Sequence, residues 1–389
     1  MHASCCPGML SVPLRPRPRL QNTARRRGER IIRTRAPLAS KLPCPPIYLS
    51  SMASTTLNLT PVHAPSIPDC FLLPVDQLRP ATAVSLPVVD MHGDRDEVRR
   101  AILDSGKEYG FIQVVNHSIP EQVMRDMEAV CHEFFQMPAE DKALFYSEDK
   151  SIRNRLFSGS SFDTLGEKYW LDVLELLYPL PSGDTSAWPH KPQRLREVVG
   201  NYTGLARGLA MEILELLCEG LGLRRDFFVG DISGGRVVVD INYYPPCPDP
   251  SRTLGLPPHC DRDLMTVLLP GAVPGLDIAY KGGWIKVLPV PNSIIINFGL
   301  QLEVVTNGLL RGVEHRASTN SANPRLSVAT FIVPADDCVV GPAEEFVSED
   351  NPPRYLTLTV GEFKRKHNIV NLGSSINQIA DLENIQKEM

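Results

Sequence analysis

Apolar and polar residues alternate along several short stretches in the second half of the chain. The clearest stretch is 325–333, Arg-Leu-Ser-Val-Ala-Thr-Phe-Ile-Val, where alternate residues face the same side of an extended backbone. From residue 235 onward, Gly, Pro and Asn separate such stretches at short intervals. This spacing is typical of an all-β barrel or sandwich. The predicted strands are 237–244, 264–269, 276–280, 284–287, 293–298, 312–318 and 325–333.

Helical spacing dominates the first half of the chain. Apolar residues recur on one face after Asp94, which predicts an amphipathic helix over 94–107. Pro120 and Glu121 are typical of a helix start, and a longer apolar stripe predicts a helix within 192–222. Two more helices are expected in the tail, at 360–367 and 376–387. Together the patterns predict a mainly β fold, a distorted jelly roll with helices packed on one side and a helical amino-terminal part.

Basic residues are concentrated at the start of the chain. Residues 1–51 hold ten Lys or Arg and one Glu, a charge of +9, and the rest of the chain holds 30 basic and 44 acidic residues, a charge of −14. An Arg-rich, acid-poor start is typical of an organelle transit peptide. The alternative, which we favour, is an over-extended gene model with translation starting at Met52. Residues 1 to about 60 are expected to be disordered, because they are rich in Pro and Arg and poor in large apolar residues.

Composition excludes several classes of protein. Nine cysteines are scattered without a Cys-x-x-Cys pair, which predicts reduced thiols in an intracellular compartment. No apolar run reaches the ~18 residues of a membrane-spanning helix, so no membrane association is expected. Nucleic-acid binding is not expected either, because the basic arm holds one tyrosine and offers no series of aromatic rings for base stacking.

Three side chains in the β-rich half carry candidate metal chemistry. His259 and Asp261 flank a single residue, and side chains so spaced in an extended backbone project from the same face. His315, from a distant strand, would complete two nitrogens and one oxygen on one side of an ion. This facial arrangement suits non-haem Fe(II) and leaves positions open for substrate and O2.

Polar residues on two further strands could bind a carboxylate near this centre. Arg325 and Ser327 share one strand face, and the planar fork of an arginine binds both oxygens of a carboxylate. Asp240, Asn242 and Tyr244 share a face of an earlier strand in the same way. Both strands therefore offer polar groups to a common site.

These motifs resemble those of the plant 2-oxoglutarate- and Fe(II)-dependent dioxygenases. Within them, the chain is most similar to the branch that contains the mugineic acid dioxygenases of grasses and hyoscyamine 6-hydroxylase. The resemblance covers roughly residues 85–389. It rests on Pro-His-Cys-Asp-Arg-Asp-Leu-Met-Thr-Val-Leu at 258–268, Asn-Phe-Gly-Leu-Gln-Leu-Glu-Val-Val-Thr-Asn-Gly at 297–308 and Glu-Phe-Lys-Arg at 362–365.

The resemblance implies a double-stranded β-helix (jelly roll) and a role for each candidate side chain. The implied catalytic iron ligands are His259, Asp261 and His315. Arg325 and Ser327 would bind the distal carboxylate of the co-substrate, 2-oxoglutarate. The positions implied to contact this co-substrate are Tyr244 and Asn242.

Two positions bear on the substrate. Phe331 matches an aromatic residue that stacks on substrates in similar enzymes, although core packing explains a strand Phe almost as well. Asp240 stands where many relatives place a neutral or basic residue. Because a buried unpaired carboxylate is costly, we hypothesise that Asp240 pairs with an amine or guanidine of the substrate, or with a neighbouring Arg.

The resemblance implies an enzyme that hydroxylates a small specialised metabolite and converts 2-oxoglutarate and O2 into succinate and CO2. Ascorbate is expected as an accessory reductant. A desaturase, demethylase or ring-closing oxidase on the same iron centre is an alternative. So are an amino-acid oxidase of the ethylene-forming kind and a non-catalytic ligand-binding relative. The branch is usually cytosolic, so we expect a cytoplasmic monomer, or a plastid protein if residues 1–51 are translated.

The expected organisation has four parts along the chain. A basic extension at 1–51 precedes an amino-terminal α/β region at 52–230. The Fe(II)/2-oxoglutarate jelly-roll catalytic domain follows at 231–336. Carboxy-terminal helices at 337–389 are expected to cover the pocket.

Overall fold

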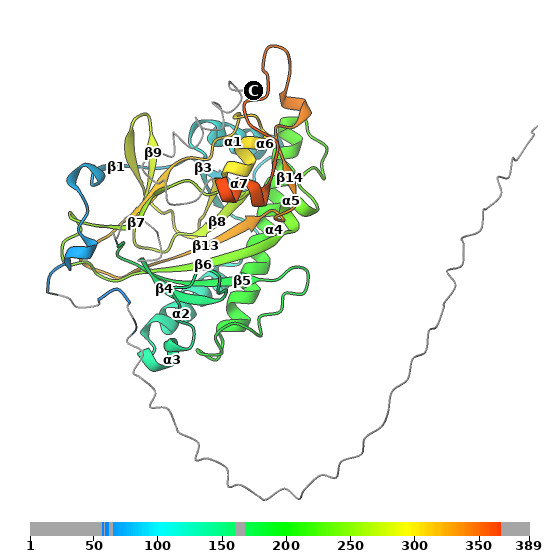
Figure 1. The fold of residues 1–389 in the computed structure, drawn as a ribbon. Coiled ribbons are helices and arrows are strands. Elements are labelled where there is room, and N and C mark those ends of the chain that lie inside the picture. Colours follow the sequence, from blue (N-terminus) through cyan, green and yellow to red (C-terminus); the bar gives the residue numbers. More distant parts are fainter. Residues whose placement is uncertain (1–56, 58, 62–64, 160–167, 367–389) are drawn as a thin grey trace, which may run out of the picture. The chain divides into compact units, whose positions relative to one another are not determined.

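Strand pairing builds two large β-sheets and one two-stranded sheet within the residues that the computed structural model describes, 57, 59–61, 65–159 and 168–366 (Figure 1). All these residues belong to one compact unit, Ser54–Met389. The larger sheet has the strand order β2 (Val88–Asp90), β3 (Phe111–Val115), β11 (Ile294–Phe298), β8 (Met265–Leu269), β13 (Arg325–Val333), β6 (Arg236–Tyr244), β5 (Asp172–Tyr178) and β4 (Arg155–Ser158). The smaller sheet has the order β1 (Ala81–Val84), β10 (Gly283–Val287), β9 (Leu276–Tyr280), β12 (His315–Ser318) and β7 (Leu254–His259).

The two sheets pack face to face over an apolar layer. One buried cluster contains Phe111 and Ile295 of the larger sheet together with Leu276, Ile278 and Ile285 of the smaller sheet. A layer shared in this way is the core of a sandwich, with the inward-facing residues of both sheets interdigitated. The predicted jelly roll with packed helices is therefore confirmed.

Helices cover the other face of the larger sheet (Figure 1). The longest, α4 (Leu195–Leu221), packs on β8 and β13 and also contacts α1 (Arg95–Glu108) and α2 (Glu121–Gln136). Its buried residues form a continuous apolar stripe, which is the pattern that predicted it. The remaining helices are short: α3 (Ala139–Ala143), α5 (Asp231–Gly234), α6 (Leu300–Val305), α7 (Val360–Lys366) and three 3₁₀ turns, Asp69–Phe71, Val75–Gln77 and Glu344–Phe346.

Local sequence chemistry explains where the main helices begin and end. The Asp94 side chain accepts hydrogen bonds from the backbone N–H groups of Asp96 and Glu97, which caps the start of α1. Helix α4 ends at Gly222, whose φ of 74° is in the left-handed region that glycine adopts without strain. No helix in the described ranges combines the length and apolar character needed to cross a membrane.

The structure differs from the sequence prediction at several strands. β7 was not predicted because it contains Pro257 and Pro258, and proline is rare inside strands. β1, β4 and β5 were not predicted as full strands, and the strand expected from residue 312 begins only at His315. The short pair β14 (Val339–Val340) and β15 (Leu358–Thr359) and helix α6 were also missed.

The expected disordered start does not extend to residue 60. Thr60 is buried, and both its backbone N–H and its hydroxyl donate to Oδ1 of Asp172 at 2.9 Å. The expectations for residues 1–51 and for a helix at 376–387 lie outside the described residues. The helix expected at 360–367 corresponds to α7.

Candidate active site

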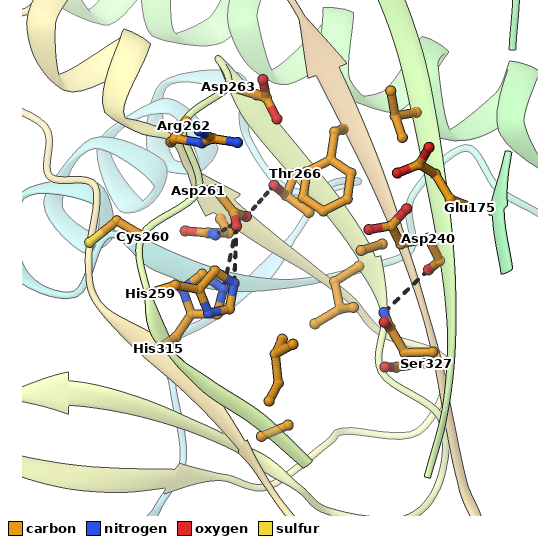
Figure 2. A pocket seen from close by; sticks show the side chains of 18 of the residues that line it. Glu175, Asp240, His259, Cys260, Asp261, Arg262, Asp263, Thr266, His315 and Ser327 are labelled. Atoms are coloured by element: carbon orange, nitrogen blue, oxygen red, sulfur yellow. Dashed lines mark hydrogen bonds and ion pairs between the residues drawn. The ribbon is translucent and has the colours of Figure 1, made fainter. Parts of the chain in front are cut away.

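Strand register brings the two candidate histidines together. His259 is the last residue of β7 and His315 the first of β12, and they are direct partners in the antiparallel pairing of these strands. Their ring centroids are 4.2 Å apart. Asp261 lies in the loop after β7 rather than within an extended strand, yet its Oδ1 is 3.5 Å from Nε2 of each histidine (Figure 2). One ligand atom from each of the three residues lies within 4.8 Å of the others.

Backbone carbonyl groups orient both imidazoles. Nδ1 of His259 lies 2.8 Å from the carbonyl of Pro257, and Nδ1 of His315 lies 3.1 Å from the carbonyl of Val313. Because a carbonyl only accepts, Nδ1 of each ring carries the proton and donates it there. Nε2 of each ring is therefore the atom that faces Asp261 and is available to bind a metal when the ring is neutral.

The Asp261 carboxylate is held by hydrogen bonds on one side only. Its Oδ2 accepts a hydrogen bond from the Thr266 hydroxyl at 2.5 Å and another from the Asn297 amide at 2.6 Å (Figure 2). Thr266 is on β8 and Asn297 on β11, so the larger sheet holds this side chain. Oδ1 remains directed at the two histidines, which suits a single oxygen ligand.

Charge coupling among the three groups shifts their pKa values. Burial alone would raise the pKa of Asp261, but the neighbouring histidines and the Thr266 hydroxyl lower it strongly. Burial and the nearby His259 lower the pKa of His315 to about 4. Burial would also lower the pKa of His259, and its contact with Asp261 reverses the direction and raises it. The cluster thus has one fixed negative charge and at least one neutral imidazole at neutral pH.

The predicted carboxylate clamp lies on two paired strands of the larger sheet. Arg325 is the direct partner of Tyr244, and Ser327 is the direct partner of Asn242, in the β13–β6 register. The guanidinium of Arg325 lies 4.8 Å from the Tyr244 ring centroid, and its Nη1 donates to the Ser327 hydroxyl at 3.2 Å. Nε of Arg325 donates to the carbonyl of Val273, which fixes the plane of the fork.

A cavity of about 450 Å³ connects the clamp to the three-residue cluster. All nine side chains proposed from sequence line it, including Phe331 and Asp240. Sequence reasoning missed its charged wall, whose members are Lys150, Arg153, Arg155, Glu175, Arg236, Arg262, Asp263, Arg316 and Lys364. These residues come from several separate elements, so only strand pairing and the docking of α7 bring them together, and no local motif signals them.

Comparison with known proteins gives the family. Residues 237–334 match the profile of the 2OG-Fe(II) oxygenase superfamily, and residues 86–196 match the profile described as non-haem dioxygenase in morphine synthesis N-terminal. The chain is 82% identical over 332 residues to mugineic-acid 3-dioxygenase of Hordeum vulgare, a match that covers 85% of this chain and 98% of that relative. The chain belongs to the 2OG-Fe(II) oxygenase superfamily.

Other relatives of the oxygenase are more distant. It is 55% identical over 336 residues to 2'-deoxymugineic-acid 2'-dioxygenase of Hordeum vulgare, which covers 86% of this chain and 99% of that relative. The solved structure of JOX2 in complex with 2OG, Fe and JA has 31% identity and a TM-score of 0.74, and the match covers 82% of this chain and 94% of that one. Both the family and the jelly roll predicted from sequence are confirmed.

The oxygenase is therefore an Fe(II)- and 2-oxoglutarate-dependent dioxygenase that hydroxylates a small molecule. Its donor set fits the metal: two imidazole nitrogens and one carboxylate oxygen face one point, which is the facial set of non-haem iron. When bound, Fe(II) with 2-oxoglutarate and O2 supplies the oxidation of the substrate C–H bond and releases succinate and CO2.

Proposed function

We propose that the oxygenase hydroxylates mugineic acid or a close analogue, at the carbon attacked by its 82% identical relative, carbon 3. The observation that carries this proposal is the identity itself, because it extends over 98% of a relative named for that reaction. The 55% identical relative, named for the 2' position of the deoxy acid, supports 2' hydroxylation as the second candidate.

The charge of the pocket wall supports an acidic substrate. Mugineic acid is an amino acid with several carboxylate groups. Beside the clamp, the cavity is lined by seven further basic side chains, Lys150, Arg153, Arg155, Arg236, Arg262, Arg316 and Lys364. Guanidinium and ammonium groups are suited to carboxylates and poorly suited to an apolar substrate.

The three clustered side chains are proposed as the iron ligands. Nε2 of His259, Nε2 of His315 and Oδ1 of Asp261 would bind Fe(II), supported by their mutual distances and by the hydrogen bonds that orient each group. The proposed role of the protein at this site is to orient the three ligand atoms. The protein would present Nε2 of both imidazoles and one carboxylate oxygen to the ion from one side.

The clamp is proposed to bind 2-oxoglutarate. Arg325 would form a bidentate pair with the distal carboxylate, and Ser327 would donate a hydrogen bond to the same group. Tyr244 and Asn242, directly opposite in the neighbouring strand, would contact the co-substrate, and Phe331 would pack against the substrate. The burial of Arg325 strengthens its pairing with a carboxylate, because water competes little there.

A decisive test uses the purified protein with Fe(II), 2-oxoglutarate, ascorbate and O2. Mugineic acid and 2'-deoxymugineic acid are supplied separately, and the products are analysed by mass spectrometry and NMR. A gain of one oxygen at carbon 3 supports the proposal, and a gain at the 2' position supports the second candidate. Loss of two hydrogens, or succinate release without a change in either acid, contradicts both.

We further propose that the oxygenase acts as a cytoplasmic monomer in plant specialised metabolism. The cysteines within the described part of the chain form no disulfide, in keeping with a reducing compartment. Light scattering after size-exclusion chromatography tests the monomer. A fluorescent fusion of the full chain, compared with one that starts at Met52, distinguishes the cytoplasm from the plastid.

A further inference from the structure

Two acidic side chains lie opposite each other on the pocket wall. Glu175 of β5 and Asp240 of β6 are direct partners in the antiparallel register of these strands. Both line the cavity, and Figure 2 shows their carboxylate groups beside one another. Directly opposed like charges destabilise a sheet, and arginines on and just before the neighbouring strand compensate Glu175: Arg155 is its direct partner on β4, and Nη1 of Arg153 lies 3.9 Å from its Oε1.

Asp240 lacks the partners that a buried carboxylate requires. Its Oδ1 is shielded from solvent and accepts no hydrogen bond within the described part of the chain. Burial, with the charge of Glu175 as the next largest cause, raises the pKa of Asp240 well above its usual value. An unsatisfied buried acceptor is unfavourable, so this position is stabilised when a cation arrives.

A buried arginine beside the pair also has an unused donor. Arg155 of β4 is only 5% exposed and lines the same cavity. Its Nη1 donates to the carbonyl of Ser147, and its guanidinium lies 4.0 Å from the Phe157 ring centroid. Its Nε is buried and has no hydrogen-bond partner among the described residues. The guanidinium is therefore held in place by the protein with one donor unsatisfied.

We propose that Asp240, Glu175 and Arg155 form a charge-pair subsite that binds an ammonium group and a neighbouring carboxylate of the substrate. This inference rests on the proposed function, because it requires an amino acid substrate. The substrate ammonium pairs with Asp240 and is further attracted by Glu175, and the carboxylate accepts from Arg155. Each substrate charge thereby pairs with a side chain that lines the cavity and keeps one atom without a partner within the described part of the chain.

The location of the subsite suits substrate positioning. Asp240 is two residues before Asn242 on the same strand and faces the small residue Ala329 across the β6–β13 pairing. The subsite therefore continues the wall that carries the proposed 2-oxoglutarate clamp. Anchoring two charges of one substrate molecule restricts its rotation, so that one of its carbons faces the three-residue cluster of His259, Asp261 and His315.

Three conservative variants test the subsite: D240N, E175Q and R155K. D226N is the matched control, because Asp226 is exposed and pairs with Arg224 on the surface. Mugineic acid is titrated calorimetrically into the anaerobic Fe(II)/2-oxoglutarate form of each protein, and KM, kcat and the ratio of product to succinate are measured in air. Thermal midpoints report on folding, and the co-substrate concentration that gives half-maximal rate reports on the clamp.

Loss of one charged hydrogen bond corresponds to about a 10- to 100-fold weaker affinity. We expect D240N to weaken mugineic acid binding by this factor and to increase succinate release without product, while the half-saturating co-substrate concentration stays unchanged. E175Q and R155K should show smaller losses, and D226N none. If D240N does not fold, E175Q and R155K decide the question in the same titration.

Two other outcomes contradict the inference in distinguishable ways. Wild-type protein that binds and hydroxylates mugineic acid, together with D240N, E175Q and R155K of unchanged affinity, overturns the subsite alone. Wild-type protein that binds neither mugineic acid nor 2'-deoxymugineic acid overturns the proposed function and the subsite with it. Equal losses of substrate affinity, co-substrate affinity and thermal midpoint in D240N assign Asp240 a structural role instead.

Discussion

The Thr266 hydroxyl lies 2.5 Å from Oδ2 of Asp261 and donates a hydrogen bond to it. The two residues belong to different elements, the loop after β7 and strand β8, and Thr266 is almost fully buried. The same oxygen accepts from Asn297, so the carboxylate cannot rotate without breaking two hydrogen bonds. A side chain outside the three-residue cluster thus sets which oxygen of Asp261 faces the histidines.

Replacing Thr266 with Val should weaken iron binding about 10- to 100-fold, because hydrogen bonds to metal ligands typically contribute that much. Val keeps the shape of the side chain and removes only the donor. Anaerobic Fe(II) titration measures the affinity. T203V is the control, because the Thr203 hydroxyl is also buried but bonds to Val199 within α4. Equal iron affinity in T266V and wild type would contradict the prediction.

Adding Fe(II) anaerobically should raise the thermal midpoint of the wild-type protein. A ligand that binds only the folded state at 100 times its Kd stabilises it by about 2.7 kcal/mol. H315A should lose this increase, because one of the three proposed ligands is gone. H132A is the control, since His132 is a half-buried histidine on α2, outside the three-residue cluster, and its ring lies edge-on to the Tyr243 ring. An undiminished iron-dependent increase in H315A would exclude His315 as a ligand.

Replacing Arg325 with Gln should raise the half-saturating concentration of the co-substrate about 10- to 100-fold, because a buried bidentate pair with a carboxylate is lost. The preference for 2-oxoglutarate over 2-oxobutyrate, which lacks the distal carboxylate, should fall by a similar factor. Succinate or propionate release measures each reaction. R225Q, at an exposed arginine, should behave as wild type. An unchanged preference in R325Q would place the co-substrate elsewhere.

Asp172 should make stability depend on pH. Burial raises its pKa to about 7, against the lowering effect of the hydrogen bonds from Thr60 and the charge of Lys142. The folded state therefore keeps this proton at pH values where the unfolded state, with a pKa near 3.9, has released it. The stabilising contribution is fully present below about pH 4 and is lost as the pH rises to about 7.

The D172N variant has no ionisable group at this position, so its stability does not decrease in this way as the pH rises. The free energy of unfolding of D172N minus that of wild type should rise between pH 4 and pH 8, by at most about 4 kcal/mol. Urea unfolding at a series of pH values measures it, and taking the difference cancels carboxylates common to both proteins. A difference that stays constant with pH would show that Asp172 is ionised throughout. D226N, at an exposed carboxylate, is measured alongside as the control substitution.

Local sequence was sufficient for features that short-range physics decides. The apolar spacing after Asp94 and the capping carboxylate itself predicted α1, and the alternation at 325–333 predicted β13. Polar residues two positions apart on one strand share a face, as predicted, since alternation in a strand fixes which side chains lie on the same side. Arg325 with Ser327 and Asn242 with Tyr244 therefore line the cavity as predicted.

Local rules failed where the partner came from elsewhere in the chain. Pro257 and Pro258 argue against a strand, but β7 forms because it pairs at the sheet edge with β12, where fewer backbone N–H groups are needed. Helix α6 is only six residues long and was missed, since so short a stretch shows no full helical period.

The sequence by itself determined the fold class and identified the candidate metal ligands and the residues of the proposed clamp, because residue type and spacing along the chain carry that information. Only the tertiary structure decided that His259 and His315 are register partners and that Thr266 and Asn297 hold Asp261. It alone set Glu175 against Asp240 across two strands. The physical reason is that burial and cross-strand pairing, which create unsatisfied charges and shift pKa values, depend on neighbours distant in the chain.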